Sequence, residues 1–269
     1  FERRWLSCGS HRWRRVIGSS EVESRAATNP VETRLPVLEV HSMGMVPYRA
    51  ALEKQRTLVK ARQVGNLPDQ LLLLEHPAVI TVGVSGRGES EHVLASSAEL
   101  HHHEIEVLEA SRGGDVTYHG PGQLVGYPII DLRPDRCDVH RYVRDLEEVL
   151  IRTVASFGVR AGRRPGLTGV WVGSDKLAAI GVRLSRWVTS HGFALNVTTN
   201  LEHFRFIVPC GLEGLGVTSL EHLLESIPPW EQLEASVSQE CARVFGRRLL
   251  TDPLDYESGQ AFQRRSIQR

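Results

Sequence analysis

The sequence predicts an α/β (α+β) fold, in which a single domain holds a mixed β-sheet flanked by helices. Two observations lead to this prediction. Short apolar runs cluster in the middle of the chain and follow one another through short connections, as antiparallel strands do. Longer segments with one apolar face lie before and after this cluster. Because strands and helices do not alternate strictly, the pattern favours a mixed sheet over a doubly wound dinucleotide-binding fold.

The first half of the domain is expected to hold one helix and five strands. The helix, Pro47 to Val64, begins with a proline, which is common in a first helical turn. Pro77 interrupts an apolar stretch and divides it into two strands. The last run is apolar almost throughout, as expected of a strand buried on both faces. The predicted strands are Val37 to His41, Leu71 to Leu74, Val79 to Val82, Ile105 to Leu108 and Leu124 to Ile130.

An amphipathic helix, three strands and a final helix follow. Apolar residues recur at helical spacing from Val139 to Val154. Asp138 is placed to cap the start of this helix and Gly158 to terminate it. Short connections between the next three strands indicate partly antiparallel pairing. These strands are Gly169 to Val172, Leu177 to Leu184 and Val188 to Val197, and the final helix lies near Trp230 to Phe245.

The composition, 41% hydrophobic and 24% charged over 269 residues, is that of an ordinary globular protein. We expect one domain at residues 36–250, between a poorly ordered basic tail at 1–35 and a second tail at 251–269. No apolar run approaches the ~20 residues that span a bilayer, and a net charge of +0 argues against nucleic-acid binding. The N-terminal segment lacks the apolar core of a signal peptide, and its glutamates weaken a mitochondrial presequence. A cytoplasmic protein is therefore expected, with the mitochondrial matrix as the alternative.

The four cysteines, Cys8, Cys137, Cys210 and Cys241, form no C-x-x-C pair. This spacing argues against a zinc ribbon, a redox pair or a disulfide scaffold, so we expect reduced thiols and no metal. Cys210 differs from the others because a proline and a glycine flank it. They favour a tight turn whose backbone amides could hold an oxyanion, although an inert buried thiol is the alternative. The other three cysteines are expected to be structural or incidental.

Two further segments have compositions that folding alone does not explain. Four glycines and a proline between Arg112 and Gln123 indicate a loop whose backbone can approach a ligand closely, with an ordinary hairpin as the alternative. This loop matches neither the Walker nor the dinucleotide-binding pattern. Lys176 begins an apolar strand, although a lysine at a hairpin tip is usually only solvated, which is the favoured interpretation for this residue taken alone. Small residues inside that strand, Ala178, Ala179 and Gly181, leave room for a ligand such as an alkyl chain.

Four blocks, in this order, resemble the signature regions of the lipoyl(octanoyl) transferase family of the biotin/lipoate protein ligase superfamily. They are RGGDVTYHGPGQLVGYPI at residues 112–129, DKLAAIGV at 175–182, TSHGFALNV at 189–197 and IVPCGLEGLGVTSL at 207–220. The resemblance spans roughly residues 37–225. It implies the fold of that superfamily, a mixed sheet flanked by helices.

The resemblance also implies roles for individual residues. Cys210 is the nucleophile that carries the acyl group as a thioester. Lys176 lowers the pKa of that thiol and shuttles protons, which an arginine could not do. His191 is a candidate for assisting the proton transfer, with a satisfied core histidine as the alternative. The implied substrate-binding residues are Arg112, Gly113, Gly114, Asp115, Val116, Thr117, Tyr118, His119, Ala179, Ile180, Gly181, Gly192, Phe193 and Ala194.

The implied activity is the first step of endogenous protein lipoylation. An octanoyl (lipoyl) group passes from octanoyl-acyl carrier protein to Cys210. It then passes to a lysine of lipoyl domains in 2-oxoacid dehydrogenases or in the glycine-cleavage H protein. No cofactor is expected, because the donor thioester is already activated. From their clustering in one loop, we expect Arg160, Arg163 and Arg164 to help dock the acidic carrier.

Three other classes of protein remain as alternatives. An ATP-dependent lipoate or biotin ligase shares the implied fold but activates a free acid and needs no nucleophilic cysteine. A non-catalytic module could bind the carrier or the lipoyl domain. A papain-like hydrolase also uses a cysteine, but the sequence around Cys210 lacks the context of that class.

Overall fold

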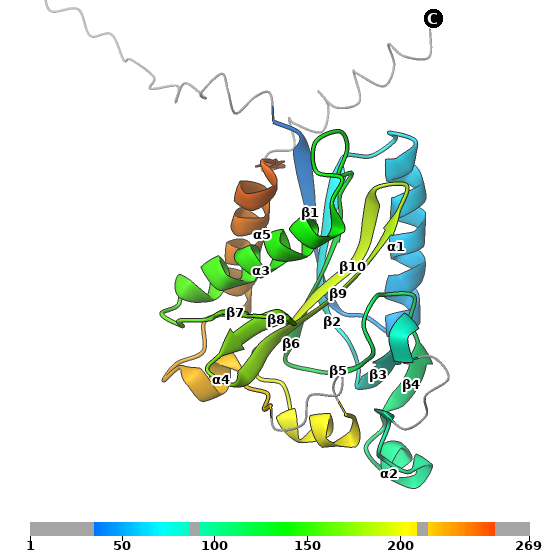
Figure 1. The fold of residues 1–269 in the computed structure, drawn as a ribbon, viewed down its shortest axis with the longest axis vertical. Coiled ribbons are helices and arrows are strands. Elements are labelled where there is room, and N and C mark those ends of the chain that lie inside the picture. Colours follow the sequence, from blue (N-terminus) through cyan, green and yellow to red (C-terminus); the bar gives the residue numbers. More distant parts are fainter. Residues whose placement is uncertain (1–34, 87–91, 209–214, 251–269) are drawn as a thin grey trace, which may run out of the picture.

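The computed structural model describes residues 35–86, 92–208 and 215–250 (Figure 1). Within them, eight strands form a large sheet and three strands form a small one. The strands of the large sheet are β1 (Val37–Met45), β2 (Asp69–Glu75), β6 (Gln123–Ile129), β7 (Gly162–Arg164), β8 (Leu167–Val172), β9 (Asp175–Ser185), β10 (Val188–Asn196) and β11 (Arg248–Leu249). Those of the small sheet are β3 (Val79–Val82), β4 (Glu106–Glu109) and β5 (Val116–His119).

The helices lie in the connections between these strands. The α-helices are α1 (Tyr48–Gln63), α2 (Ser97–His102), α3 (Val139–Ala155), α4 (Leu220–Leu223) and α5 (Trp230–Phe245). Two 3-10 helices, η2 (Val84–Gly86) and η4 (Leu201–Phe206), complete the described elements. In residues 35–86, 92–208 and 215–250, no helix combines the length and the apolar character that crossing a bilayer requires.

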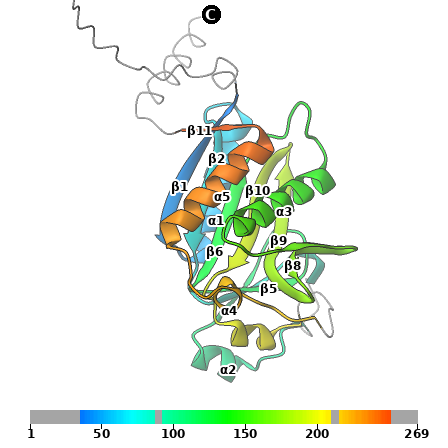
Figure 2. The same cartoon turned by 90° about the vertical axis from the view of Figure 1, so that its left-hand side faces the viewer.

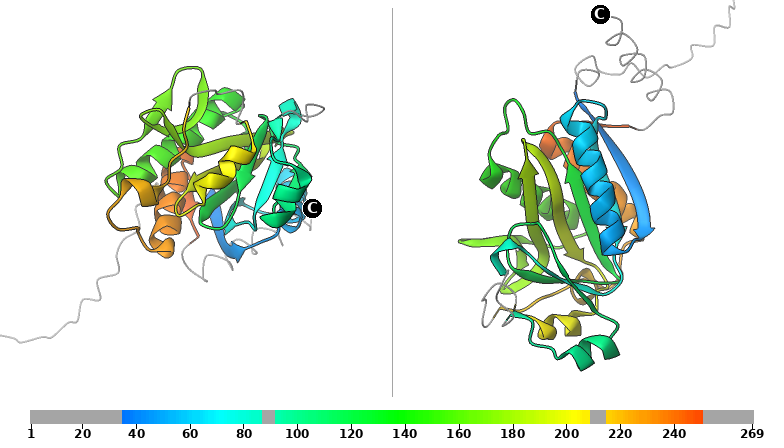
Figure 3. Two further views of the ribbon diagram at one scale, coloured as in Figure 1. Left: turned by 90° about the horizontal axis from the view of Figure 1, so that it is seen from below. Right: turned by 90° about the vertical axis from the view of Figure 1, so that its right-hand side faces the viewer.

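The large sheet is mixed, as the sequence predicts. Its strand order is β11-β1-β2-β6-β10-β9-β8-β7. β1 pairs in parallel with β11 and β2, while the pairs from β2 onward to β7 are antiparallel. Helices α3 and α5 cover one face of this sheet (Figure 2), and α1 covers the other (Figure 3). The predicted mixed sheet flanked by helices is therefore confirmed.

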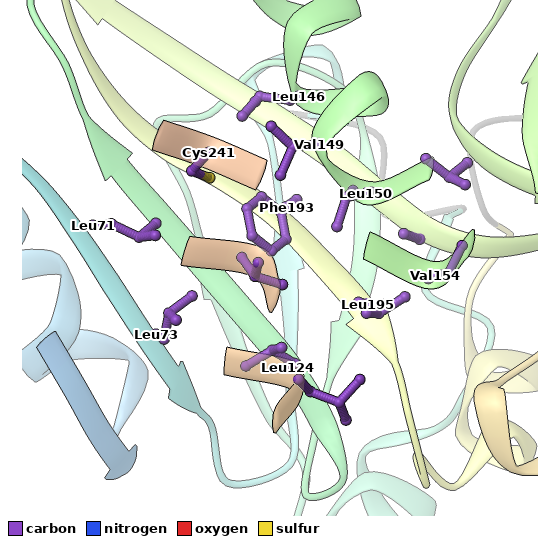
Figure 4. Close-up of a cluster of buried hydrophobic side chains, with 14 of the residues drawn as sticks. Leu71, Leu73, Leu124, Leu146, Val149, Leu150, Val154, Phe193, Leu195 and Cys241 are labelled. Atoms are coloured by element: carbon purple, nitrogen blue, oxygen red, sulfur yellow. The ribbon is translucent and has the colours of Figure 1, made fainter. Parts of the chain in front are cut away.

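The run of leucines in β2 explains why this strand lies at the centre of the sheet. Alternate side chains of a strand point to opposite faces. Leu71 and Leu73 accordingly join the core under α3 and α5, whereas Leu72 and Leu74 join the core under α1. All four are fully buried, and each contributes roughly 1.5–3 kcal/mol relative to an exposed position. Figure 4 shows the core on the α3–α5 side, in which the thiol of Cys241 takes the place of an apolar side chain.

The two ends of α3 follow the sequence prediction. The side chain of Asp138 accepts hydrogen bonds from the backbone N–H groups of His140 and Arg141, as an N-cap does. Gly158 has φ +88 and donates to the carbonyl of Ala155, while Val159 donates back to Val154. This pair of hydrogen bonds is the Schellman motif, which requires a left-handed residue after the helix and therefore favours glycine.

The sequence did not predict that the strands form two separate sheets. In the small sheet, β3 pairs in parallel with β4 and antiparallel with β5. Ile80 is buried beside Tyr118 and Phe206, and Val79 is buried beside Tyr48 and Leu108, so neither lies in the main core. The small sheet thereby lies across one end of the large sheet (Figure 1). The predicted tails fall outside the described residues, apart from Leu35, and the predicted domain bounds stay predictions.

Candidate active site

A cavity of about 510 Å³ lies where the glycine-rich segment and the small sheet meet β9 and β10. It is large enough for a small-molecule ligand, for which cavities of roughly 300–1,000 Å³ are typical. The cavity has apolar walls on both faces of the large sheet. β8 pairs with β9 only as far as Ala178, so the edge of β9 beyond that residue is open to the cavity. Apolar and small residues in the lining include Val116, Val139, Val143, Leu167, Ala179, Ile180, Val182, Phe193, Ala194 and Val217.

Arg112 fixes the glycine-rich segment to the rest of the fold. Its guanidinium donates from Nη2 to the carbonyl of Thr81 at 2.7 Å and to its hydroxyl at 2.9 Å. The next residue, Gly113, donates its N–H to Val182 on the open edge of β9 at 2.9 Å. A Cβ on Gly181 would lie 2.9 Å from Arg112 Cδ and 3.1 Å from the Gly113 carbonyl. Only a glycine at 181 therefore lets the segment approach β9 this closely.

Of the seven other implied substrate-binding residues of this segment, six line the cavity. Gly113, Gly114, Asp115, Val116, Thr117 and His119 line the cavity with Arg112. Tyr118 does not, because its ring packs among Ile80, Phe204 and Phe206. Its hydroxyl is hydrogen-bonded to His203 Nδ1 at 2.8 Å. Tyr118 therefore packs in the core beside the small sheet, and its role in binding a substrate stays a prediction.

Two histidines in the cavity region are held neutral by burial. His76 donates from Nδ1 to the Val46 carbonyl at 2.6 Å and accepts from the Tyr127 hydroxyl at 2.7 Å. His119 donates from Nδ1 to the side-chain carbonyl of Gln123 at 2.7 Å. Burial lowers the pKa of His76 to about 4, and burial together with the neighbouring His76 and Arg112 lowers the pKa of His119 to about 3. Both rings are therefore uncharged at neutral pH.

His191 is placed by the backbone of β10. It has φ +54, and its N–H donates to Gln55 Oε1 on α1 at 2.7 Å. Its ring lies 3.2 Å from the Ser111 hydroxyl, measured from Nε2, and edge-on to Tyr127. Burial, followed by the charge of Arg112, lowers its pKa to about 4. His191 lines the cavity as a neutral imidazole, and its role stays a prediction.

Sequence analysis missed the aromatic part of this lining. Tyr48 and Tyr127 both line the cavity, and the Tyr48 ring stacks on His119 with the centroids 6.2 Å apart. The sequence presents Tyr48 only as the first residue of α1 and Tyr127 only as part of an apolar strand. His76 stands beside the proline that separates two strands. The sequence signal that could have identified these residues is the presence of polar aromatic rings in segments otherwise expected to be fully buried.

Lys176 stands at the start of β9 and lines the cavity. Its Nζ lies 4.8 Å from the centre of the Trp171 ring. Its backbone N–H donates to the Gly216 carbonyl, and its carbonyl accepts from Thr218, so residues 216–218 run alongside it. Cys210 lies outside the described residues. Among the described neighbours in sequence, Val208 donates its N–H to the His92 carbonyl at 3.0 Å.

The small residues of β9 are not equivalent. Ala179 and Gly181 line the cavity, whereas Ala178 is fully buried in the main core. The expectation that all three leave room for a ligand therefore holds for two positions, because Ala178 lies where β8 still pairs with β9. On β10, Gly192, Phe193 and Ala194 line the cavity as well.

The expected carrier-docking arginines are largely engaged within the chain. Arg163 pairs with Glu147 at 3.0 Å and with Glu148 at 2.8 Å. The guanidinium of Arg164 lies 5.4 Å from the centre of the Trp171 ring. Arg160 is exposed. A docking role for these arginines stays a prediction. The described ranges contain no group of three or more potential metal-ligating side chains.

Comparison with known proteins relates this cavity to a family. Residues 47–242 match the family model described as the lipoyl protein ligase A/B catalytic domain. The octanoyltransferase of Caldicellulosiruptor bescii is 50% identical over 214 residues, which cover 79% of this chain and 93% of the relative. That of Rubrobacter xylanophilus is 49% identical, covering 83% and 98%. That of Myxococcus xanthus is 46% identical, covering 80% of this chain but 62% of a longer protein.

Solved structures agree with this assignment at the level of the fold. Lipoate-protein ligase A bound with ATP has a TM-score of 0.65 at 14% identity, covering 85% of this chain and 94% of the ligase. A bi-partite lipoate protein ligase from Thermoplasma acidophilum has a TM-score of 0.62 at 13% identity, covering 85% and 92%. The family model covers 73% of this chain, and the octanoyltransferase relatives are near 50% identity. The chain therefore belongs to the lipoyl protein ligase A/B catalytic domain family, among the acyltransferases of its octanoyltransferase branch.

Proposed function

We propose that this chain transfers an octanoyl group from octanoyl-acyl carrier protein to a lysine of lipoyl domains, through a thioester on Cys210. The acceptors are lipoyl domains of 2-oxoacid dehydrogenases and the glycine-cleavage H protein. The relatives named octanoyltransferase support the group that is transferred. As these relatives are bacterial, we place the reaction in the cytoplasm.

The observation that carries the proposal is the position of Lys176. It stands in the wall of a cavity with mostly apolar and small residues, where an alkyl chain would be shielded from water. The strand segment that pairs with Lys176 begins six residues after Cys210 in the chain. A flexible ammonium there can stabilise a nearby thiolate and can also exchange a proton, which the guanidinium of Arg112 cannot do.

The reaction has two acyl transfers. The Cys210 thiolate attacks the thioester carbonyl of the carrier, a C–S bond forms to Cys210, and the C–S bond to the carrier breaks. The departing carrier thiolate takes a proton from Lys176. A lysine amine of the lipoyl domain then attacks the Cys210 thioester, an amide forms, and the thiolate of Cys210 is released as the amine loses its proton to Lys176 or His191.

The cavity residues implied by the family have separable roles in this scheme. Ala179, Ile180, Gly181 and the Gly192–Ala194 segment form walls for the acyl chain. Arg112 holds Gly113 and Gly114 in place, so that the backbone from 113 to 117 presents polar groups at a fixed distance from β9. His119 and the other neutral rings provide polar contacts without a charge, which would be costly to bury beside an acyl chain.

The proposal is tested by mixing the chain with octanoyl-carrier protein and following its intact mass without ATP. We expect a single octanoyl adduct that disappears when apo lipoyl domain is added, with one octanoyl group appearing on that domain. Cys210→Ser should abolish the adduct. Cys137→Ser is the matched control, because Cys137 is an exposed free cysteine outside the cavity lining, and should leave the adduct unchanged.

Two outcomes would contradict the proposal. An adduct that survives Cys210→Ser would show that another residue is the nucleophile. A strict need for ATP and free octanoate would favour the ligase alternative, which shares the fold at 13–14% identity but not this branch of the family.

A further inference from the structure

Trp171 contacts the amino group on which the proposed function depends. It lies on β8 directly across from Lys176 on β9, in an antiparallel pair. Its side chain is buried, with 3% of the residue exposed. The Lys176 Nζ lies 4.8 Å from the centre of its ring, within the roughly 6 Å at which a cation is attracted to an aromatic face.

The stem of Lys176 is guided toward this ring by Gly169. That glycine has φ +122, a conformation that side chains other than hydrogen rarely adopt. A Cβ there would lie 3.6 Å from Lys176 Cε, 3.7 Å from Cδ and 2.7 Å from the Ala178 carbonyl. The backbone of Gly169 therefore leaves a path for the methylene groups of Lys176, and any larger residue would push against the strand.

The indole has a feature that packing alone does not account for. Trp171 Nε1 is buried and has no hydrogen-bond partner among the residues that the structure describes. A buried N–H without a partner is unfavourable, and phenylalanine would fill the position without it. Tryptophan, however, has the aromatic face that attracts cations most strongly. A second cation, Arg164, lies 5.4 Å from the centre of the same ring.

The β7–β8 hairpin that carries the ring is held by α3. Glu147 on α3 accepts the Gly169 N–H of β8 at 3.1 Å and an Nε–H bond from Arg163 of β7 at 3.0 Å. These contacts hold both strands of the β7–β8 hairpin against a helix of the main core. The face presented to Lys176 is therefore preorganised before any substrate enters.

We propose that Trp171 is a positioning residue: its indole face holds the Lys176 ammonium in the cavity wall. The effect of Trp171 on the reaction rests on the proposed function, in which Lys176 lowers the pKa of the Cys210 thiol. Trp171 itself does not react. Its removal should leave the acyl-chain walls intact but allow the ammonium to turn toward solvent.

The test compares Trp171→Leu, Trp171→Phe and Trp187→Leu with the unchanged chain. Trp187 is the matched control, because it lies in the β9–β10 turn with 41% of its surface exposed. The first readout is the pH dependence of iodoacetamide alkylation at Cys210, followed by mass spectrometry of the peptide that contains it. We expect Trp171→Leu to move the alkylation midpoint upward by about one pH unit, Trp171→Phe to move it less, and Trp187→Leu not to move it.

The second readout is octanoyl transfer to apo lipoyl domain. We expect Trp171→Leu to lower kcat about tenfold with KM for the carrier changed less than about twofold, and Trp171→Phe to recover most of the loss. Circular dichroism identifies folded variants, and Trp171→Phe keeps the ring in case Trp171→Leu does not fold. An alkylation midpoint unchanged in both Trp171 variants overturns the inference, whether or not octanoyl transfer occurs. Failure of the unchanged chain to form an adduct contradicts the proposed function instead.

Discussion

Glu147 is the buried anchor of the cavity wall, and its replacement gives the sharpest test of how that wall is held. Its carboxylate is fully buried, although its two arginine partners are half-exposed. It accepts from Arg144 at 2.6 Å, from Arg163 at 3.0 Å and from the Gly169 N–H at 3.1 Å. We compare Glu147→Gln, which can still accept from Gly169, with Glu147→Ala, which cannot.

The expected losses follow from what each variant leaves without a partner. A hydrogen bond to a charged group contributes roughly 1.5–3 kcal/mol, but the arginine side chains are 51% and 36% exposed, so we reduce this to about 1 kcal/mol for each. Glu147→Gln should therefore lower the free energy of unfolding by about 2 kcal/mol. Glu147→Ala also orphans the buried Gly169 N–H and leaves a void, for a total of about 4 kcal/mol.

Urea unfolding followed by circular dichroism measures both losses. The matched control is Glu148→Gln, the neighbouring carboxylate, whose side chain is 31% exposed and pairs with Arg152 and Arg163. It should cost less than about 1 kcal/mol. Equal losses for Glu147→Gln and Glu147→Ala would refute the reasoning, because the Gly169 contact would then contribute nothing.

Two further predictions concern acid stability and the packing of the sheet. Stability should fall as the pH is lowered from about 6.5 toward 4, because three buried histidines have lowered pKa values and the unfolded chain takes up protons that the folded chain does not. Each should contribute a slope of about 1.4 kcal/mol per pH unit in that range, and a urea midpoint that stays constant between pH 7 and 5 would contradict this. The three are His76, His119 and His191. A Cβ at Gly126 would overlap the ring of Phe193, so Gly126→Ala should destabilise the chain by about 1–3 kcal/mol. Gly162→Ala is the control, because its Cβ meets nothing within 4 Å, and it should cost less than about 1 kcal/mol. Equal losses of stability in the two variants would refute the packing argument.

The parts of the fold that could be predicted from sequence depend on local chemistry. Asp138 and Gly158 mark the ends of α3 because capping and the Schellman motif need only a few neighbouring residues. The leucines of β2 indicate a central strand because burial on both faces leaves no polar positions. The separation of β3, β4 and β5 into their own sheet could not be predicted, because it depends on pairings between segments distant in sequence.

The site shows the same division. The glycine-rich segment, the small residues of β9 and Lys176 were identified because their composition is unusual for strands and loops. For Trp171 the sequence predicts only a position in an apolar strand, since its cation contact arises when β8 pairs with β9. Arg112 was expected to contact a substrate, yet its hydrogen bonds to Thr81 show that it also holds the loop itself. A motif identifies residues that matter, but not whether they contact a ligand or support one that does.

The polar residues around the cavity raise the question of how it could hold an alkyl chain. The answer lies in their mutual hydrogen bonds. His119 donates to Gln123, the amide of Gln123 donates to Asn196 at 2.9 Å, and Asn196 donates to the Thr218 carbonyl at 3.0 Å. Because these polar atoms bond to one another, burying them beside an alkyl chain carries little further cost. The same chain of bonds ends at Thr218, whose N–H donates to the carbonyl of Lys176, so the polar lining and the proposed catalytic lysine are positioned by one connected network.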